Sequence, residues 1–127
     1  MTEKVRDSGG FGEAAAYSRA VRYAEHVAVS ATAALEGGKV LHRGDAYGQT
    51  KEAIRRALVS AEELGATKES IVRTRLLLAP GCDWREAVRA HAEAFASIDP
   101  ANTTYFVGGL IPEGALVEVE LDGYVGG

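Results

Sequence analysis

Residues 115–121 read ALVEVEL, and the alternation in this stretch sets the fold class. In an extended chain, Val117, Val119 and Leu121 share one face, while Glu118 and Glu120 share the other. A strand of this kind buries its apolar face against a core and leaves its acidic side chains on the far side. The stretch therefore predicts a strand of a sheet that is covered by helices on one face only.

Two helices are predicted to supply that cover. Apolar side chains recur at helical spacing over residues 49–64 and again over residues 83–96. We expect Thr50 to cap the first helix, Gly65 to end it, and Asp83 to cap the second. The buried stripe of the first helix is predicted to be Ala53, Ile54, Ala57, Leu58, Ala61 and Leu64. That of the second is predicted to be Trp84, Ala87, Val88, His91 and Phe95.

Strand-like segments lie before, between and after these helices, over residues 18–23, 26–34, 39–42, 70–79, 103–110 and 115–125. Helices that alternate with strands in this way indicate a layered fold, with both helices on one face of a single sheet. A chain of 127 residues has the length of one domain, so we expect residues 1–127 to form a single domain.

The face of the sheet opposite the helices is predicted to be an interface. One solvated face is common in antiparallel sheets and is the alternative interpretation. However, residues 76–79 (LLLA) and 103–109 (TTYFVGG) are too apolar for a fully wet face. We therefore expect this face to pack against other copies of the chain, with Glu118 and Glu120 in or near clefts between subunits.

Composition and charge narrow the classes of partner. The formal net charge of −4 argues against a nucleic-acid ligand, because proteins that bind nucleic acids carry a basic surface. No apolar run approaches the roughly 20 residues that span a bilayer. The first ten residues have no apolar core of a signal peptide, so we expect a cytoplasmic protein without a membrane partner. The single cysteine, Cys82, permits no internal disulfide, and three histidines without ligand spacing predict no metal site.

Several segments together resemble the reactive intermediate deaminase (Rid) family, also called YjgF or endoribonuclease L-PSP. They are YSRAVRYAEHVAVSATAA (from Tyr17), GQTKEAIRRALVSAEELGAT, SIVRTRLLL, DWREAVRAHAEAFA, PANTT and GALVEVEL, in the family's order over about residues 17–121. The resemblance implies an α+β, chorismate-mutase-like fold and a homotrimer whose sheets form a central barrel with three clefts between subunits. It also implies hydrolysis of enamines and imines derived from amino acids, giving 2-keto acids and ammonia without a cofactor.

The resemblance also implies a set of site residues. Glu118 matches a glutamate that positions or activates water, which makes it the candidate catalytic residue. Tyr17, Ser30 and Thr104 match residues that line the cleft. An arginine in a Pro-Ala-Arg motif holds the substrate carboxylate in this family, but this chain has Asn102 at that position. The chain thus resembles a branch that lacks the cleft arginine.

The substitution at position 102 alters the expected substrate. Asn is too short and lacks the charge of a guanidinium, and hydrogen bonds to charged groups are the stronger ones. We expect Asn102 to bind a neutral polar group and the substrate to differ from a simple 2-imino acid. The leading hypothesis is a trimer that hydrolyses another imine or enamine compound. The alternative is a non-catalytic trimer that binds a small metabolite.

Each candidate residue has a structural alternative. Glu118 could pair with Arg73 or Arg75 at an interface, and either arginine could replace the missing cation. Glu120 is expected to be a partner in a salt bridge. Tyr17 could be a packed aromatic, while Ser30 and Thr104 could be ordinary strand residues. His91 lies on the apolar stripe of its helix, which favours a core or half-buried histidine.

Overall fold

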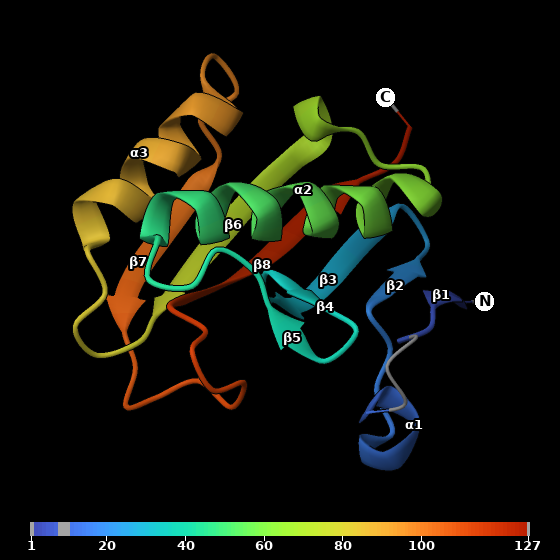
Figure 1. Ribbon diagram of the computed structural model, residues 1–127. Helices are drawn as coiled ribbons and strands as arrows, with labels where there is room; N and C mark the ends of the chain where they lie inside the picture. Colours follow the sequence, from blue (N-terminus) through green and yellow to red (C-terminus); the bar gives the residue numbers. More distant parts are fainter. Residues whose placement is uncertain (1, 8–10, 127) are drawn as a thin grey trace.

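The computed structural model describes residues 2–7 and 11–126 and shows a six-stranded sheet with two long helices on one face (Figure 1). In chain order the elements are β1 (Thr2–Val5), α1 (Phe11–Ala15), β2 (Ala20–Tyr23), β3 (His26–Thr32), β4 (Leu35–Glu36), β5 (Lys39–Val40), α2 (Ala46–Glu63), a 3₁₀ turn (Lys68–Ser70), β6 (Ile71–Leu78), α3 (Trp84–Phe95), β7 (Ala101–Phe106) and β8 (Val117–Tyr124). The prediction of an α+β fold with one mixed sheet and both helices on one face is confirmed.

The strand order is β1-β2-β3-β8-β6-β7. All neighbouring strands are antiparallel except β6 and β7, which run parallel and are joined through α3. In this parallel pair Asn102 lies beside Thr74. Parallel neighbours need a crossover connection, and a helix on the covered face is the usual one. The register fixes which face of the sheet each residue of β7 points to.

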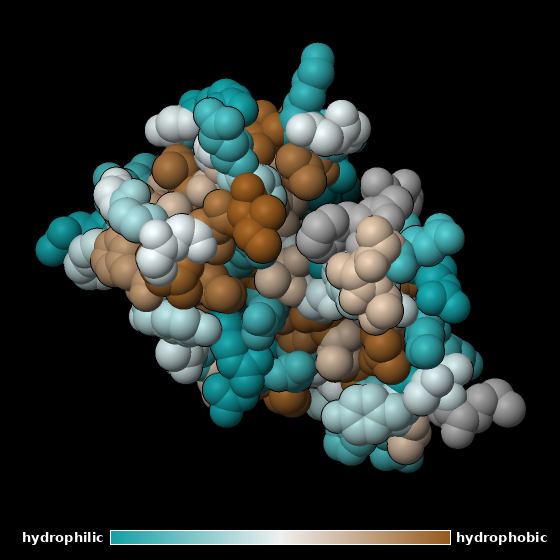
Figure 2. Space-filling model, turned by 90° about the horizontal axis from the view of Figure 1, so that it is seen from below, coloured by the Kyte–Doolittle hydropathy of each residue, from teal (hydrophilic) through white to brown (hydrophobic). Residues whose placement is uncertain are grey.

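The strand predicted at residues 39–42 does not join the main sheet. β4 and β5 instead form a separate two-stranded hairpin, with Gly37 and Gly38 at its turn. Their φ angles of 57° and 79° match the two-residue turn that suits the twist of a hairpin and that favours glycine. The hairpin lies below α2 in Figure 1. Figure 2 shows the molecule from below, where exposed apolar side chains lie among polar ones.

Helix α2 begins one turn earlier than predicted. Its N-cap is Asp45, whose Oδ1 accepts a hydrogen bond from the Gly48 amide at 2.9 Å. Thr50 was predicted as the cap but lies inside the helix, where its hydroxyl donates to the Ala46 carbonyl. The first turn was missed because it carries no apolar repeat. Gly65 follows the C-cap with φ of 98°, as predicted.

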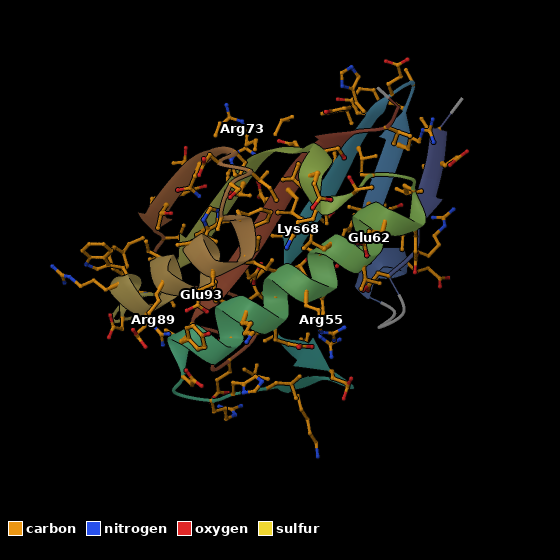
Figure 3. All side chains as sticks on the ribbon, turned by 90° about the horizontal axis from the view of Figure 1, so that it is seen from above. Arg55, Glu62, Lys68, Arg73, Arg89 and Glu93 are labelled. Carbon is orange, nitrogen blue, oxygen red and sulfur yellow. The ribbon has the colours of Figure 1, made fainter. Side chains whose placement is uncertain are left out.

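Helix α3 covers only the edge of the sheet, over β6 and β7 (Figure 1). Ala87 and Phe95 are buried as predicted, and Asp83 caps the helix. Trp84 and Val88 were predicted to be buried, but 42% and 37% of their surfaces are exposed, because a helix at an edge buries a narrower stripe. Arg89 and Glu93 lie on its outer surface (Figure 3) and form an ion pair.

No helix in the described part of the chain is long and apolar enough to cross a membrane.

Strand β7 was predicted over residues 103–110 but spans Ala101–Phe106. As the outermost strand it pairs only with β6, and the last backbone bond between them runs from the Val107 amide to the Leu78 carbonyl. Once β6 ends, the chain leaves the sheet despite its β-like composition. Residues 107–116 therefore form a loop before β8.

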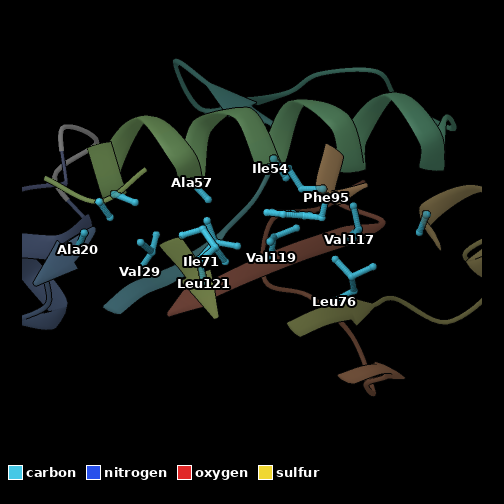
Figure 4. Packing of buried hydrophobic residues seen from close by; sticks show 14 of the residues in the cluster. Ala20, Val29, Ile54, Ala57, Ile71, Leu76, Phe95, Val117, Val119 and Leu121 are labelled. Atoms are coloured by element: carbon cyan, nitrogen blue, oxygen red, sulfur yellow. The ribbon is translucent and has the colours of Figure 1, made fainter. Parts of the chain in front are cut away.

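The core lies between α2 and the sheet (Figure 4). Val117, Val119 and Leu121 are fully buried there, as the alternation in residues 115–121 predicted. The α2 stripe predicted from helical spacing packs over them, with Leu58 only half-buried and the other five residues buried. The alternate residues of β8, Glu118 and Glu120, point to the opposite face of the sheet.

Candidate functional site

A broad groove lies at the end of the sheet where β3 ends and β8 begins. Tyr17, Arg19 and Glu118 line it on the face without helices. Its rim includes Ile111 from the loop before β8, and Arg55 from the outer surface of α2 (Figure 3). The groove thus brings together residues from distant parts of the chain.

Glu118 is the second residue of β8 and is half-buried in this groove. Burial raises the pKa of its carboxyl above the ordinary value; the positive charge of Arg19 opposes this, and the nearby Glu120 adds to it. Among the described residues no cation lies within ion-pair distance of Glu118. A carboxyl whose pKa is raised and which has no ion pair is better suited to accept and then release a proton than one held by a cation.

The alternative pairing of Glu118 with Arg73 or Arg75 is not found. Nη1 of Arg75 lies 3.2 Å from Oε1 of Glu120 and 3.5 Å from Oδ2 of Asp122, so Glu120 is the salt-bridge partner. Arg73 points away from the helices (Figure 3). Neither arginine lines the groove, so neither replaces the missing cation there.

Arg19 is the groove residue that the sequence reasoning missed. Its guanidinium carbon lies 5.3 Å from the centre of the Tyr17 ring, and its Nη2 donates to the Ala31 carbonyl at 2.8 Å. Its Nε is buried without an acceptor among the described residues. Its position in the sequence could have identified it. Arg19 stands two residues after Tyr17 and next to Ala20, whose side chain is in the core, so in an extended chain Arg19 faces the side opposite the core.

Ser30 lies close to this region without lining the groove. Its hydroxyl donates to the Ser18 carbonyl at 2.7 Å, next to an irregularity in β3 between Val29 and Thr32. The hydroxyl proton is therefore used inside the chain. Ser30 ties the start of β2 to β3, and its oxygen keeps lone pairs for a further contact.

Asn102 and Thr104 lie on the helix-covered side of β7. Nδ2 of Asn102 donates to Oγ1 of Thr74 at 2.9 Å, and Oγ1 of Thr104 donates to Oδ1 of Asn102 at the same distance. Because side chains alternate along a strand, Asn102 and Glu118 point to opposite faces of the sheet within one chain. The single chain therefore brings Tyr17 and Glu118 together but not Asn102 or Thr104.

The hydrogen bonds of Asn102 continue to α3. Oγ1 of the fully buried Thr74 lies 2.7 Å from Nε2 of His91. Burial lowers the pKa of this half-buried histidine below its ordinary value, which favours the neutral ring. The expectation that His91 is a partly buried histidine with a partner is confirmed.

The remaining reactive groups do not form a second centre. Burial raises the pKa of the Cys82 thiol, which keeps it protonated and unreactive at neutral pH. Within residues 2–7 and 11–126, no three His, Cys, Asp or Glu side chains come together in a metal-binding arrangement.

Comparison with known proteins agrees with this fold. The family model described as endoribonuclease L-PSP matches residues 10–125. The curated protein SCO2049 of Streptomyces coelicolor is 37% identical over 97% of this chain and 92% of its own length. The crystal structure of Rv2704 from Mycobacterium tuberculosis, a member of the YjgF/YER057c/UK114 family, superposes with a TM-score of 0.85 at 36% identity. That match covers 98% of this chain and all of Rv2704.

More distant structures share the fold alone. YyfA of Yersinia pestis, described as a protein of the conserved Rid family, superposes with a TM-score of 0.79 at 23% identity. The match covers 98% of this chain and all of the YyfA chain. From the family model over most of its length, and from the likeness to SCO2049 and Rv2704, the chain belongs to the endoribonuclease L-PSP family, which is also called the YjgF or Rid family.

Proposed function

We propose that the protein is a cytoplasmic homotrimer with clefts for a small metabolite between its subunits, and that it hydrolyses an imine or enamine compound other than a simple 2-imino acid. The observation that carries this proposal is Glu118: a half-buried carboxyl with a raised pKa, without an ion pair in the described chain, and in a groove. Groups with such perturbed titration in a groove are typical of sites that transfer protons.

Glu118 would act on water in two steps. It first takes a proton from the attacking water while the C–O bond forms and the π electrons of the C=N bond move to nitrogen, which receives that proton. It then takes the hydroxyl proton of this adduct and passes it to nitrogen while the C–N bond breaks. Ammonia leaves, a carbonyl remains, and Glu118 ends in its starting state. Imine and water are thus converted to a carbonyl compound and ammonia.

Asn102 supports the exclusion of a simple 2-imino acid. A substrate carboxylate that enters a dry cleft without a cationic partner is strongly disfavoured. The Asn102 amide has no charge and already bonds to Thr74 and Thr104. Its Nδ2 donates to the Thr74 carbonyl as well, at 3.5 Å, and one oxygen lone pair remains, which suits a neutral polar group of the ligand.

The proposal is tested by the rate of hydrolysis of imines that amine and amino-acid oxidases generate in situ, with 2-aminoacrylate included. We expect the protein to accelerate the hydrolysis of at least one imine other than 2-aminoacrylate. Glu118→Gln should abolish this acceleration, while Glu120→Gln, a change on the same strand face, should keep it. Robust turnover of 2-aminoacrylate that Asn102→Ala abolishes would contradict the substrate assignment.

A non-catalytic, ligand-binding trimer is the second candidate. It is favoured by the hydrogen bonds of Asn102 to Thr74 and of Thr104 to Asn102, which hold both side chains away from the face of Glu118. Tight binding of a keto acid or a small amide that is unchanged in Glu118→Gln, without any product, would support this candidate over the enzyme.

A further inference from the structure

A series of hydrogen bonds runs from the edge strand β7 to helix α3, which covers this edge of the sheet (Figure 1). Thr104 donates to Asn102, and Asn102 donates to Thr74. Oγ1 of Thr74 then lies 2.7 Å from Nε2 of His91 on α3. Thr74 is fully buried and His91 is half-buried, whereas Asn102 is exposed. The outer end of the series can therefore contact a ligand, while packing holds its inner end in place.

The amide nitrogen of Asn102 is the end of the side chain that faces Thr74. Nδ2 lies 2.9 Å from Oγ1 of Thr74 and 3.5 Å from its carbonyl oxygen. A carbonyl oxygen only accepts hydrogen bonds, so the amide oxygen of Asn102 would be repelled at this place. The amide oxygen therefore points the other way, where it accepts a hydrogen bond from the Thr104 hydroxyl.

The direction of this bond fixes the direction of the next one. Oγ1 of Thr74 accepts from Asn102, and its single proton needs an acceptor because a buried donor without one is costly. Nε2 of His91 is the acceptor that the structure places there. The ring is then neutral, with its proton on Nδ1. Burial lowers the pKa of His91, which agrees with a neutral ring.

Asn102 thus has one hydrogen-bonding position left for a ligand, and that position is an acceptor. Both contacts of Nδ2 go to Thr74, and Thr104 occupies one of the two lone pairs of Oδ1. The remaining lone pair accepts a hydrogen bond and repels a second acceptor. A guanidinium has the opposite character, because it only donates.

We propose that His91 is a positioning residue, which acts through Thr74 to hold the Asn102 amide with its oxygen outward. This position then selects a neutral ligand that carries a hydrogen-bond donor, such as an amide N–H or a hydroxyl. A carboxylate or an ester offers only acceptors there and is disfavoured. The inference deepens the proposed function, because it rests on the assignment of Asn102 to the ligand cleft and specifies the neutral polar group that is bound.

The first test compares two neutral ligands that differ in one group. N-Methylpyruvamide has an N–H where methyl pyruvate has an ester oxygen, and the two molecules have nearly the same size and shape. Their dissociation constants would be measured by NMR titration of the full chain at pH 7. We expect the wild type to bind the amide about fivefold more tightly than the ester, which is the contribution of one neutral hydrogen bond.

Three variants separate positioning from a merely structural role. In His91→Phe the Thr74 hydroxyl loses its acceptor and turns to the Asn102 oxygen, so the preference for the amide should fall below about twofold. His91→Gln offers a side-chain oxygen to the same hydroxyl and should restore most of the preference. Arg89→Gln, on the outer surface of α3, is the matched control and should bind both ligands as the wild type does.

The tautomer of His91 provides a second test, which needs no ligand and no variant. The nitrogen chemical shifts of the imidazole ring in the wild type should show Nε2 unprotonated and Nδ1 protonated at pH 7. A proton on Nε2 would overturn the inference. Equal affinity of the wild type for the amide and the ester, an unchanged preference in a folded His91→Phe, or no saturable binding of either ligand would overturn it as well.

Failure of the proposed function would look different. Loss of hydrolysis in every assay leaves the tautomer of His91 and both dissociation constants unaffected. Conversely, a protonated Nε2 or a preference for the ester would overturn the role of His91 without changing whether Glu118 supports hydrolysis.

Discussion

At the scale of single residues, the environment of each carboxyl decides its chemistry. Glu118 and Glu120 are two residues apart on one face of β8. Glu120 lies against Arg75, which neutralises its charge, whereas Glu118 is half-buried without an ion pair in the described chain. The same side chain therefore forms an ion pair at one position and, in the proposed function, carries a proton at the other.

The raised pKa of Glu118 predicts a pH-dependent effect of its removal. A carboxyl whose pKa rises on folding favours the folded state below its unfolded pKa, near 4.5, and this contribution is lost as pH rises through the folded pKa. At pH 7, Glu118→Gln should therefore raise the melting temperature, and the gain should shrink towards pH 4. Glu120→Gln, which breaks an ion pair, should give no such gain. Thermal unfolding of the wild type and both variants at pH 7 and at pH 4 checks this prediction.

Thr74 predicts a cost of removing one buried hydroxyl. Thr74→Val keeps the shape but leaves Nδ2 of Asn102 and Nε2 of His91 without their shared partner. Asn102 is exposed and can bond to water instead, so the cost comes mainly from the half-buried His91, and the free energy of unfolding should fall by about 0.5–1.5 kcal/mol, the net contribution of one hydrogen bond. Urea denaturation of Thr74→Val, Asn102→Ala and the double variant should show that the two costs are not additive.

At the scale of elements, local capping explains where α2 begins. Asp45→Ala should lower the free energy of unfolding by about 0.5–2 kcal/mol, because the Gly48 amide loses its acceptor. Asp45→Asn keeps a side-chain oxygen at the same position and should cost much less. Equal costs in urea denaturation for the two variants would show that charge, and not the hydrogen bond, matters at this N-cap.

The elements also show how far the sequence predicts this molecule. Periodicity identified both long helices, the core face of β8 and the succession of the main strands along the chain, since each depends on local alternation. It did not show that β4 and β5 leave the sheet, or that Trp84 is exposed, because both depend on where the sheet ends. Arg19 was missed for a related reason: its place beside Glu118 follows from pairing between strands distant in sequence.

At the scale of the whole molecule, the helix-free face connects fold and assembly. Tyr105 is 40% exposed there, close to the apolar Leu77 beside it in register. If this face packs against other subunits, light scattering should give a mass near three times 13.4 kDa. Tyr105→Asp should lower that mass, while Val88→Asp on the outer side of α3 should leave it unchanged. A monomeric mass for the wild type would remove the basis for clefts between subunits.

Arg19 and Glu118 belong to one chain, and this has a consequence for mixed assemblies. If the chain forms the proposed trimer, subunits carrying Arg19→Gln and subunits carrying Glu118→Gln could be combined in it, yet no groove would contain both intact residues. The two defects could not complement each other, either in a refolded mixture or in a cell that expresses both variants. If the proposed clefts take Asn102 from a neighbouring subunit, a defect at Asn102 would instead be rescued in part by mixing. Complementation therefore reports which chain supplies each half of the site.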